Sequence, residues 1–180
     1  MNNFIPHRKT NRLLRTPVLF LFAFSFFTLL SCGVYTFRDV SIDYSKIKTI
    51  KISYIENKAR YVNAQLSPRV TDGLQQKIAS YTKLTRTTND DAHYQISGYI
   101  NNYNVTTSAI AAKQAATNRL TVGAHIVFKN TVENKTQEFD VSRDFDFAAN
   151  LTLQEAEGRL MDDIVKNLSD EIFNRIFSNW

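Results

Sequence analysis

The feature that most constrains the fold of this chain is an apolar stripe near its carboxy-terminal end. Leucine and isoleucine recur there at four-residue intervals, and three further residues widen the stripe: Leu160, Ile164, Leu168, Ile172 and Ile176, with Met161, Val165 and Phe173 beside them. This spacing is that of one face of an α-helix. Thr152 and Glu155 match a capping box, in which the two side chains accept hydrogen bonds from backbone amides at the helix start. The pattern predicts a long amphipathic helix over residues 153–177.

Charged pairs favour the same helix. Acidic residues precede basic residues by four positions, the favourable order on a helix, in Glu155–Arg159, Asp162–Lys166 and Glu171–Arg175. A second helix is predicted over about residues 68–82, where apolar side chains repeat at helical spacing. Ser67 and Pro68 match an N-cap residue followed by proline at the first helical position. Gly73 lies inside this helix, where a glycine often marks a closely packed neighbour.

The remaining ordered segments alternate between apolar and polar side chains, as half-buried strands do. A strand begins at Thr49, residues 84–88 leave room for a short one, and three long strands are predicted from residues 92–105, 119–129 and 139–147. The predicted order is β-α-β-β-β-α. It indicates an α+β fold in which two amphipathic helices pack on one face of a mostly antiparallel sheet of about four strands.

The first long strand has two interpretations. Ile96 and Ile100 lie on one face of a regular strand, whereas Tyr99, Tyr103 and Val105 lie on the other. Either the strand carries apolar residues on both faces, or a bulge shifts its phase. If the second face meets solvent, Tyr99 and Tyr103 are conspicuous there and mark an interaction surface.

The first 31 residues have the layout of an export signal. Basic residues come first (Arg8, Lys9, Arg12 and Arg15), an apolar run follows over residues 18–30, and no acidic residue occurs before Asp39. As a helix the run would measure roughly 20 Å, against about 30 Å of bilayer hydrocarbon. We therefore expect a secretion signal and not a spanning helix.

The run ends in Leu29-Leu30-Ser31-Cys32, which resembles the lipobox of bacterial lipoproteins. In that family the cysteine receives a diacylglyceryl group, the chain is cut before it, and the new amino group is acylated, for example with palmitate. Two or more acyl chains anchor a protein stably, whereas one does so only marginally. The resemblance implies a signal peptide at 1–31 and lipid attachment at Cys32. The mixed, polar composition that follows predicts a tether at 32–48, and a single domain at 49–180 begins with the first strand. The alternative is a plain signal peptide that happens to contain a cysteine.

Charge and chemistry exclude several classes of function. All 17 acidic residues but only 18 of the 22 basic ones follow Cys32, so the remaining chain is nearly neutral and does not favour nucleic-acid binding. His93 and His125 occur singly, and the five glycines are too scattered for a phosphate-binding loop. The acidic pairs Asp90-Asp91, Asp144/Asp146 and Asp162-Asp163 fit solvated surfaces. We predict no catalytic residue, no metal site, no cofactor and no enzyme.

The link between the first two long strands contains Lys113 and Arg119 as its only charges. Two cations without a nearby acid can bind a phosphorylated glycolipid through charge-assisted hydrogen bonds. An ordinary hairpin tip with solubilising cations explains the same composition.

Taken together, the lipobox, "CGVYTF", "IKISYI", "VNAQLS", "NRLTV" and "EIFNRIFSNW" resemble the LptE-type lipopolysaccharide-assembly lipoproteins, in particular their branch outside the proteobacteria. In that family two helices pack on a four-stranded sheet. The lipoprotein is a plug inside the outer-membrane barrel LptD, helps that barrel assemble, and contacts lipopolysaccharide. The residue after Cys32 is Gly33 and not an aspartate, which by resemblance to sorting rules disfavours retention in the inner membrane.

The resemblance implies a lipid-anchored outer-membrane location, facing the periplasm or inside the barrel lumen, with LptD and lipopolysaccharide as partners. By position, Lys113 and Arg119 are the nearest counterparts of the family's basic lipid-contacting residues. Tyr99 and Tyr103 are candidates for filling the lumen. The alternative is an accessory lipoprotein of another envelope complex, such as a secretin pilotin or a barrel-assembly subunit.

Lipidation is testable at its attachment residue. Cys32→Ala removes the thiol that would be acylated, so we expect the protein to leave the outer-membrane fraction, because it lacks the acyl chains that hold it there. Cell fractionation measures this, with Ser41→Ala as a control outside the lipobox. Unchanged partitioning of Cys32→Ala, or a bare thiol in the mass spectrum of the unaltered protein, would contradict lipidation.

Overall fold

The computed structural model describes residues 42–107 and 117–178. Cys32, the predicted signal peptide and Lys113 lie outside the described residues. The elements in chain order are β1 (Thr49–Ile52), β2 (Glu56–Asn57), α2 (Leu66–Tyr81), β3 (Thr85–Arg86), β4 (Tyr94–Thr107), β5 (Thr117–Asn130), β6 (Lys135–Ala148) and α3 (Leu153–Phe177).

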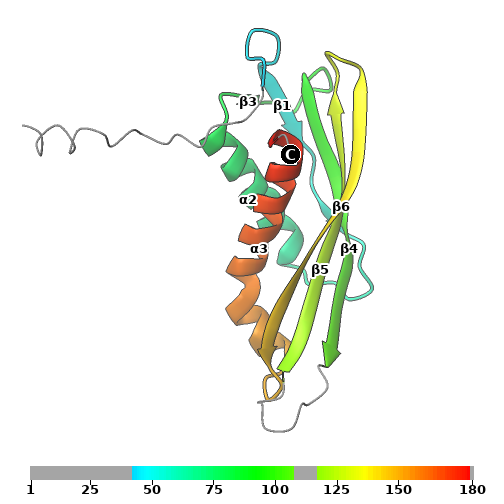
Figure 1. Ribbon diagram of the computed structural model, residues 1–180, viewed down its shortest axis with the longest axis vertical. Coiled ribbons are helices and arrows are strands. Elements are labelled where there is room, and N and C mark those ends of the chain that lie inside the picture. Colours follow the sequence, from blue (N-terminus) through cyan, green and yellow to red (C-terminus); the bar gives the residue numbers. More distant parts are fainter. Residues whose placement is uncertain (1–41, 108–116, 179–180) are drawn as a thin grey trace, which may run out of the picture. The chain divides into compact units, whose positions relative to one another are not determined.

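The strands form one sheet in the order β3-β1-β4-β5-β6, with β2 also pairing with β4. The long strands β4, β5 and β6 are antiparallel, whereas β1 and β2 run parallel to β4 and β3 runs parallel to β1. Both helices cover the same face of the sheet (Figure 1). The predicted α+β fold is confirmed, and the sheet exceeds four strands through the two-residue strands β2 and β3.

The core lies between the helices and the sheet. Its largest fully buried side chains come from both layers: Ile50, Ile55, Leu66, Leu74, Ile78, Ile96, Ile100, Leu120, Ile126, Ile164, Leu168 and Ile172. Burying one such side chain contributes about 1.5–3 kcal/mol. The predicted start of α3 is confirmed, because Thr152 Oγ1 accepts a hydrogen bond from the Glu155 amide and the Glu155 carboxylate accepts one from the Thr152 amide. In the described residues, neither helix has the length and apolar character needed to cross a membrane.

Helix α2 begins earlier than predicted. The N-cap position belongs to Gln65 and not to Ser67, whose buried hydroxyl has no hydrogen-bond partner. The reason is a turn at Asn63, where the side-chain oxygen accepts a hydrogen bond from the Gln65 amide at 2.9 Å. An asparagine that bonds the amide two residues ahead starts a turn by itself, so the chain is already helical when it reaches Ser67.

The first long strand contains a bulge, so the second of its two interpretations is confirmed. The register of β4 against β5 shifts between Ile100 and Asn102. The extra residue reverses the alternation, so that Tyr103 faces the helices as Ile100 does, while Tyr99 points away from them. The expectation that Tyr103 projects outward beside Tyr99 is therefore corrected, since only 5% of Tyr103 is exposed.

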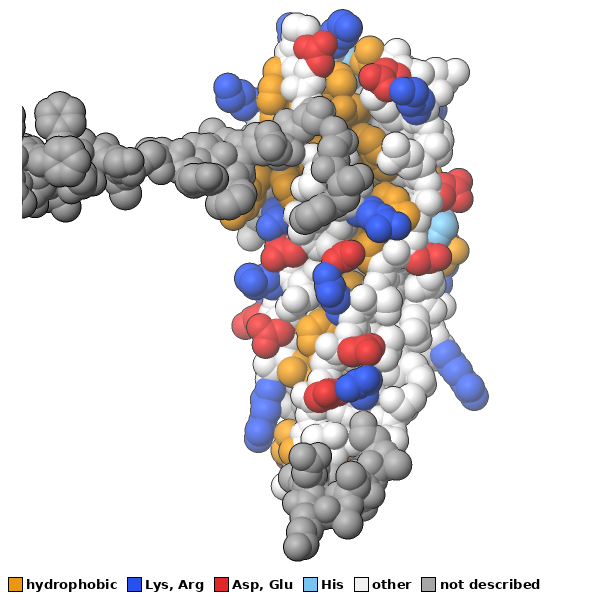
Figure 2. Space-filling model, viewed as in Figure 1, with side chains coloured by type: hydrophobic (Ala, Val, Ile, Leu, Met, Phe, Trp, Pro, Cys, Tyr) orange, Lys and Arg blue, Asp and Glu red, His pale blue; other side chains and the backbone are white. Residues whose placement is uncertain are grey.

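The two helices approach each other closely. A Cβ atom at Gly73 would lie 2.8 Å from Val165 Cγ1, so the predicted close neighbour of this glycine is confirmed. Arg69 of α2 pairs with Asp162 of α3, and Lys77 pairs with Asp170 at 2.6 Å. In the view of Figure 2, acidic and basic side chains are interspersed in this way along the molecule.

The acidic residues of α3 do not bond as the sequence pairs indicated. Asp162 pairs with α2, and Glu171 pairs with Arg143 of β6, so their ion pairs link different elements. For these two residues, neighbours brought together by the fold replace the partners on the same helix, whereas Lys166 and Asp170 form a pair within α3 at 3.8 Å.

The close contact between β4 and β5 yields a stability prediction. A Cβ atom at Gly98 would lie 2.3 Å from the backbone oxygen of His125, so Gly98→Ala forces the strands apart. We expect Gly98→Ala to lower the free energy of unfolding by about 1–3 kcal/mol, measured by chemical denaturation. Gly158→Ala is the control: its Cβ would meet nothing within 4 Å, and alanine should stabilise α3 by up to about 1 kcal/mol. Equal stability of both variants would contradict the close contact.

Candidate functional site

The first candidate surface is the outer face, defined as the side of β4, β5 and β6 that points away from the helices. Tyr99, Arg119 and His125 lie on it. Strand β6 places four carboxylates on the same face, of which Asp140 lies opposite His125 and Asp146 opposite Arg119: Glu138, Asp140, Asp144 and Asp146. The predicted inward and outward alternation of β6 is confirmed, because Val141, Phe145 and Phe147 are buried.

The middle of the outer face is occupied by the Tyr99 cluster, which consists of Lys58, Tyr99, His125, Glu138 and Asp140. The Tyr99 ring lies 5.3 Å from the His125 ring, centroid to centroid, and Lys58 Nζ lies 4.9 Å from the Tyr99 centroid. His125 Nδ1 is 3.1 Å from Asp140 Oδ1, and its Nε2 is 3.6 Å from Glu138 Oε2. The cluster therefore combines charges of both signs with an aromatic ring, a residue type that is enriched at protein interfaces.

The two histidines in the described part of the chain, His93 and His125, have separate environments. His93 Nδ1 lies 2.6 Å from Thr49 Oγ1, and the His93 amide donates back to the same hydroxyl at 3.1 Å, which links β1 to the start of β4. His125 belongs to the Tyr99 cluster. Among the described residues, no three histidine, cysteine, aspartate or glutamate side chains are grouped as metal ligands would be.

Arg119 lies near one end of the outer face and already has anionic partners. Its Nε and second terminal nitrogen lie 2.8 and 3.1 Å from the two oxygens of Asp146, and another nitrogen lies 3.7 Å from Asp144 Oδ2. The hydrogen bonds and charge of Arg119 lower the pKa of Asp146 below its usual value. A phosphate that binds Arg119 must therefore compete with two carboxylates.

The second candidate site lies on the helical side of the sheet. The Tyr103 hydroxyl donates a hydrogen bond to Glu157 Oε1 at 2.6 Å, and the Tyr61 ring stacks on Tyr103 at 5.3 Å between centroids. Burial, together with the neighbouring Glu157 carboxylate, raises the pKa of both phenols. Sequence reasoning missed Glu157. Its signal was an acidic residue in line with the apolar stripe, four positions before Met161 and four after Leu153.

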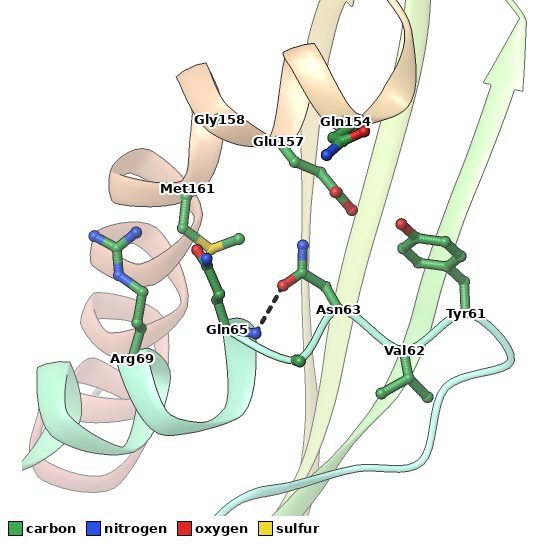
Figure 3. A pocket seen from close by; sticks show the side chains of 10 residues that line it. Tyr61, Val62, Asn63, Gln65, Arg69, Gln154, Glu157, Gly158 and Met161 are labelled. Atoms are coloured by element: carbon green, nitrogen blue, oxygen red, sulfur yellow. Dashed lines mark hydrogen bonds between the residues drawn. The ribbon is translucent and has the colours of Figure 1, made fainter.

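A cavity of about 490 Å³ adjoins this buried pair. It lies between the segment that leads into α2 and the first turns of α3 (Figure 3). Its walls include Tyr61, Gln65 and Arg69 from one side and Glu157 and Met161 from the other. The cavity is thus a pocket lined by a buried acidic side chain, Glu157, which belongs to α3.

The fold and these surfaces define a small α+β domain with two polar candidate sites. Residues 47–176 match the model of the LptE family, described as lipopolysaccharide-assembly. This match covers most of the chain, and the chain belongs to the LptE family. Membership assigns it a role in lipopolysaccharide assembly, and the family is non-catalytic. Among curated proteins, no sequence matches significantly.

Several solved structures are similar to this chain at low sequence identity. A putative neuraminyllactose-binding hemagglutinin homologue from Helicobacter pylori has 8% identity and a TM-score of 0.54, covering 80% of this chain and 90% of that one. A minor lipoprotein from Acinetobacter baumannii has 15% identity and a TM-score of 0.49, covering 72% and 91%. Rare lipoprotein B from Shewanella oneidensis has 14% identity and a TM-score of 0.39, covering 70% and 89%. At such identity the Helicobacter structure supports the fold alone.

The Arg119–Asp146 pair yields a pH prediction. Arg119→Gln removes the guanidinium, so the pKa of Asp146 should rise towards its usual value. The pair stabilises the folded state above the unfolded carboxyl pKa, and this contribution is lost as the pH falls through the lower folded pKa. Titration of the Asp146 carboxyl carbon by NMR measures the change. Lys129→Gln, elsewhere on β5, is the control; an equal change in both variants would contradict the pairing.

Proposed function

We propose that this chain is an outer-membrane lipoprotein that plugs the LptD barrel, helps it assemble and assists the transport of lipopolysaccharide to the cell surface. Membership of the LptE family is the observation that carries the proposal, because it assigns lipopolysaccharide assembly to the chain. Our proposal adds three features to this role: the plugging of the barrel, LptD as the partner, and the lipid anchor.

The proposed domain organisation begins with a signal peptide at 1–31 and lipid attachment at Cys32. Ile47 is buried, and Ile42 and Tyr44 pack against the core. We therefore shorten the proposed tether to residues 32–41 and let the folded domain begin at about residue 42. Ten extended residues would span up to roughly 35 Å, which leaves the domain close to the lipid surface.

The outer face is our proposed contact with the barrel. The lumen of a large membrane barrel is polar, and the Tyr99 cluster offers a ring with paired charges to such a wall. Arg119 is our proposed contact with lipid phosphate, together with Lys113. A guanidinium binds phosphate in a bidentate manner as it binds Asp146 here.

Depletion of the protein tests the function as a whole. We expect less lipopolysaccharide at the cell surface and less mature LptD barrel, measured by surface labelling and by immunoblotting. Both should return when the unaltered protein is re-expressed. Normal values of both after depletion would contradict the proposal, and recovery of a secretin instead of LptD in a pull-down would favour the pilotin alternative.

The contact surface can be tested in the same strain. Tyr99→Ala should reduce the amount of LptD that co-purifies, because it removes the ring at the centre of the cluster. Tyr54→Ala, which changes a tyrosine that is 55% exposed outside the cluster, is the matched control. Equal recovery with both variants would remove the Tyr99 cluster from the proposed interface.

A further inference from the structure

We propose that the cavity beside the first turns of α3 receives the cationic end of an arginine or lysine side chain from a protein partner, with Glu157 as the acceptor. The proposal concerns the helical side of the domain and does not depend on the proposed role of the outer face.

The first observation is a buried carboxylate without a cation. Only 7% of Glu157 is exposed. Among the described residues, no lysine or arginine lies within ion-pair distance of it, and the hydrogen bond that reaches it comes from Tyr103 and ends on Oε1. A buried charge is costly unless it is paired. The groups beside Glu157 are the phenols of Tyr103 and Tyr61, which are neutral, so a cation that enters the cavity would meet a carboxylate without a counterion.

The cation that lines the same cavity is engaged elsewhere. Arg69 pairs with Asp162 on α3, which neutralises both groups. In Figure 3, Arg69 and Glu157 point to different ends of the cavity. The negative charge of Glu157 is thus left without compensation by the arginine, and an anionic occupant would be repelled by it.

The walls of the cavity suit a cation with several N–H donors. Gln65 and Gln154 line it and carry amide oxygens, which accept hydrogen bonds from the additional donors of an ammonium or a guanidinium. Tyr61 lies at its edge, and the face of an aromatic ring attracts a cation. The raised pKa values of Tyr61 and Tyr103 keep both phenols neutral, so neither competes as an anion.

The surroundings of the cavity favour a protein partner over a free small amine. Tyr61 and Val62 both line the cavity and are large exposed side chains, with 44% and 59% of each accessible. A partner that inserts one basic side chain would also cover these two residues. Anchoring by an arginine beside aromatic and apolar side chains is typical of the energetically dominant part of a protein interface.

The experiment compares two ligands of nearly equal shape. Nα-acetyl-arginine amide is titrated into the full-length protein in detergent, and Nα-acetyl-citrulline amide serves as its neutral counterpart. We expect saturable NMR shifts at Tyr61, Asn63 and Gly158 with the arginine derivative and no saturable shifts with the citrulline derivative. Equal shifts with both ligands would overturn the proposal.

Two variants locate the acceptor. Glu157→Gln keeps the volume and can still accept the Tyr103 hydrogen bond, and we expect it to weaken binding by about tenfold or more. Asp163→Asn removes an exposed negative charge from the same helix and should leave binding unchanged. Equal losses in both variants would overturn the proposal, as would unaltered binding by Glu157→Gln, which would make Glu157 a structural partner of Tyr103. If Glu157→Gln does not fold, the comparison of the two ligands on the unaltered protein decides.

Discussion

The whole domain depends on the burial of two helical stripes against one face of the sheet. Ile164, Leu168 and Ile172 of α3 are fully buried, as are Leu120 and Ile126 of β5. Because both helices cover the same face, the opposite face of β4, β5 and β6 has no layer over it among the described residues (Figure 1). One face of the sheet therefore stabilises the domain, while the other is available for contact. Apolar and polar side chains alternate along β5 and β6 because successive residues point to these two different faces.

The bulge at Asn101 connects the fold to the internal site. Without the extra residue, Tyr103 would point away from the helices and could not reach Glu157. With it, the Tyr103 phenol of β4 donates a hydrogen bond to Glu157 of α3, a residue that lines the cavity. Bulges recur where a strand must re-aim a side chain, and here one inserted residue places the aromatic ring beside the buried carboxylate.

Sequence periodicity predicted the long helices and strands, but it missed features that depend on single contacts. The start of α3 followed from Thr152 and Glu155, and the long strands followed from their alternation. The start of α2 did not, because the turn at Asn63 outweighs the N-cap signal of Ser67. Strand β2 is too short to show a period, whereas β3 lies within residues 84–88, where a short strand had been allowed. Glu157 was missed because its partner lies 54 residues away in sequence, where only the fold brings the two together.

The position of β6 at the end of the strand order has a consequence for solubility. A long strand at a sheet edge can serve as a template on which another chain adds. Two copies of β6 paired antiparallel about Ser142 would bring Asp140 of one chain opposite Asp144 of the other. Like charges directly opposite each other destabilise such a ladder. The acidic row on β6 therefore disfavours the pairing of two copies of this protein through the β6 edge.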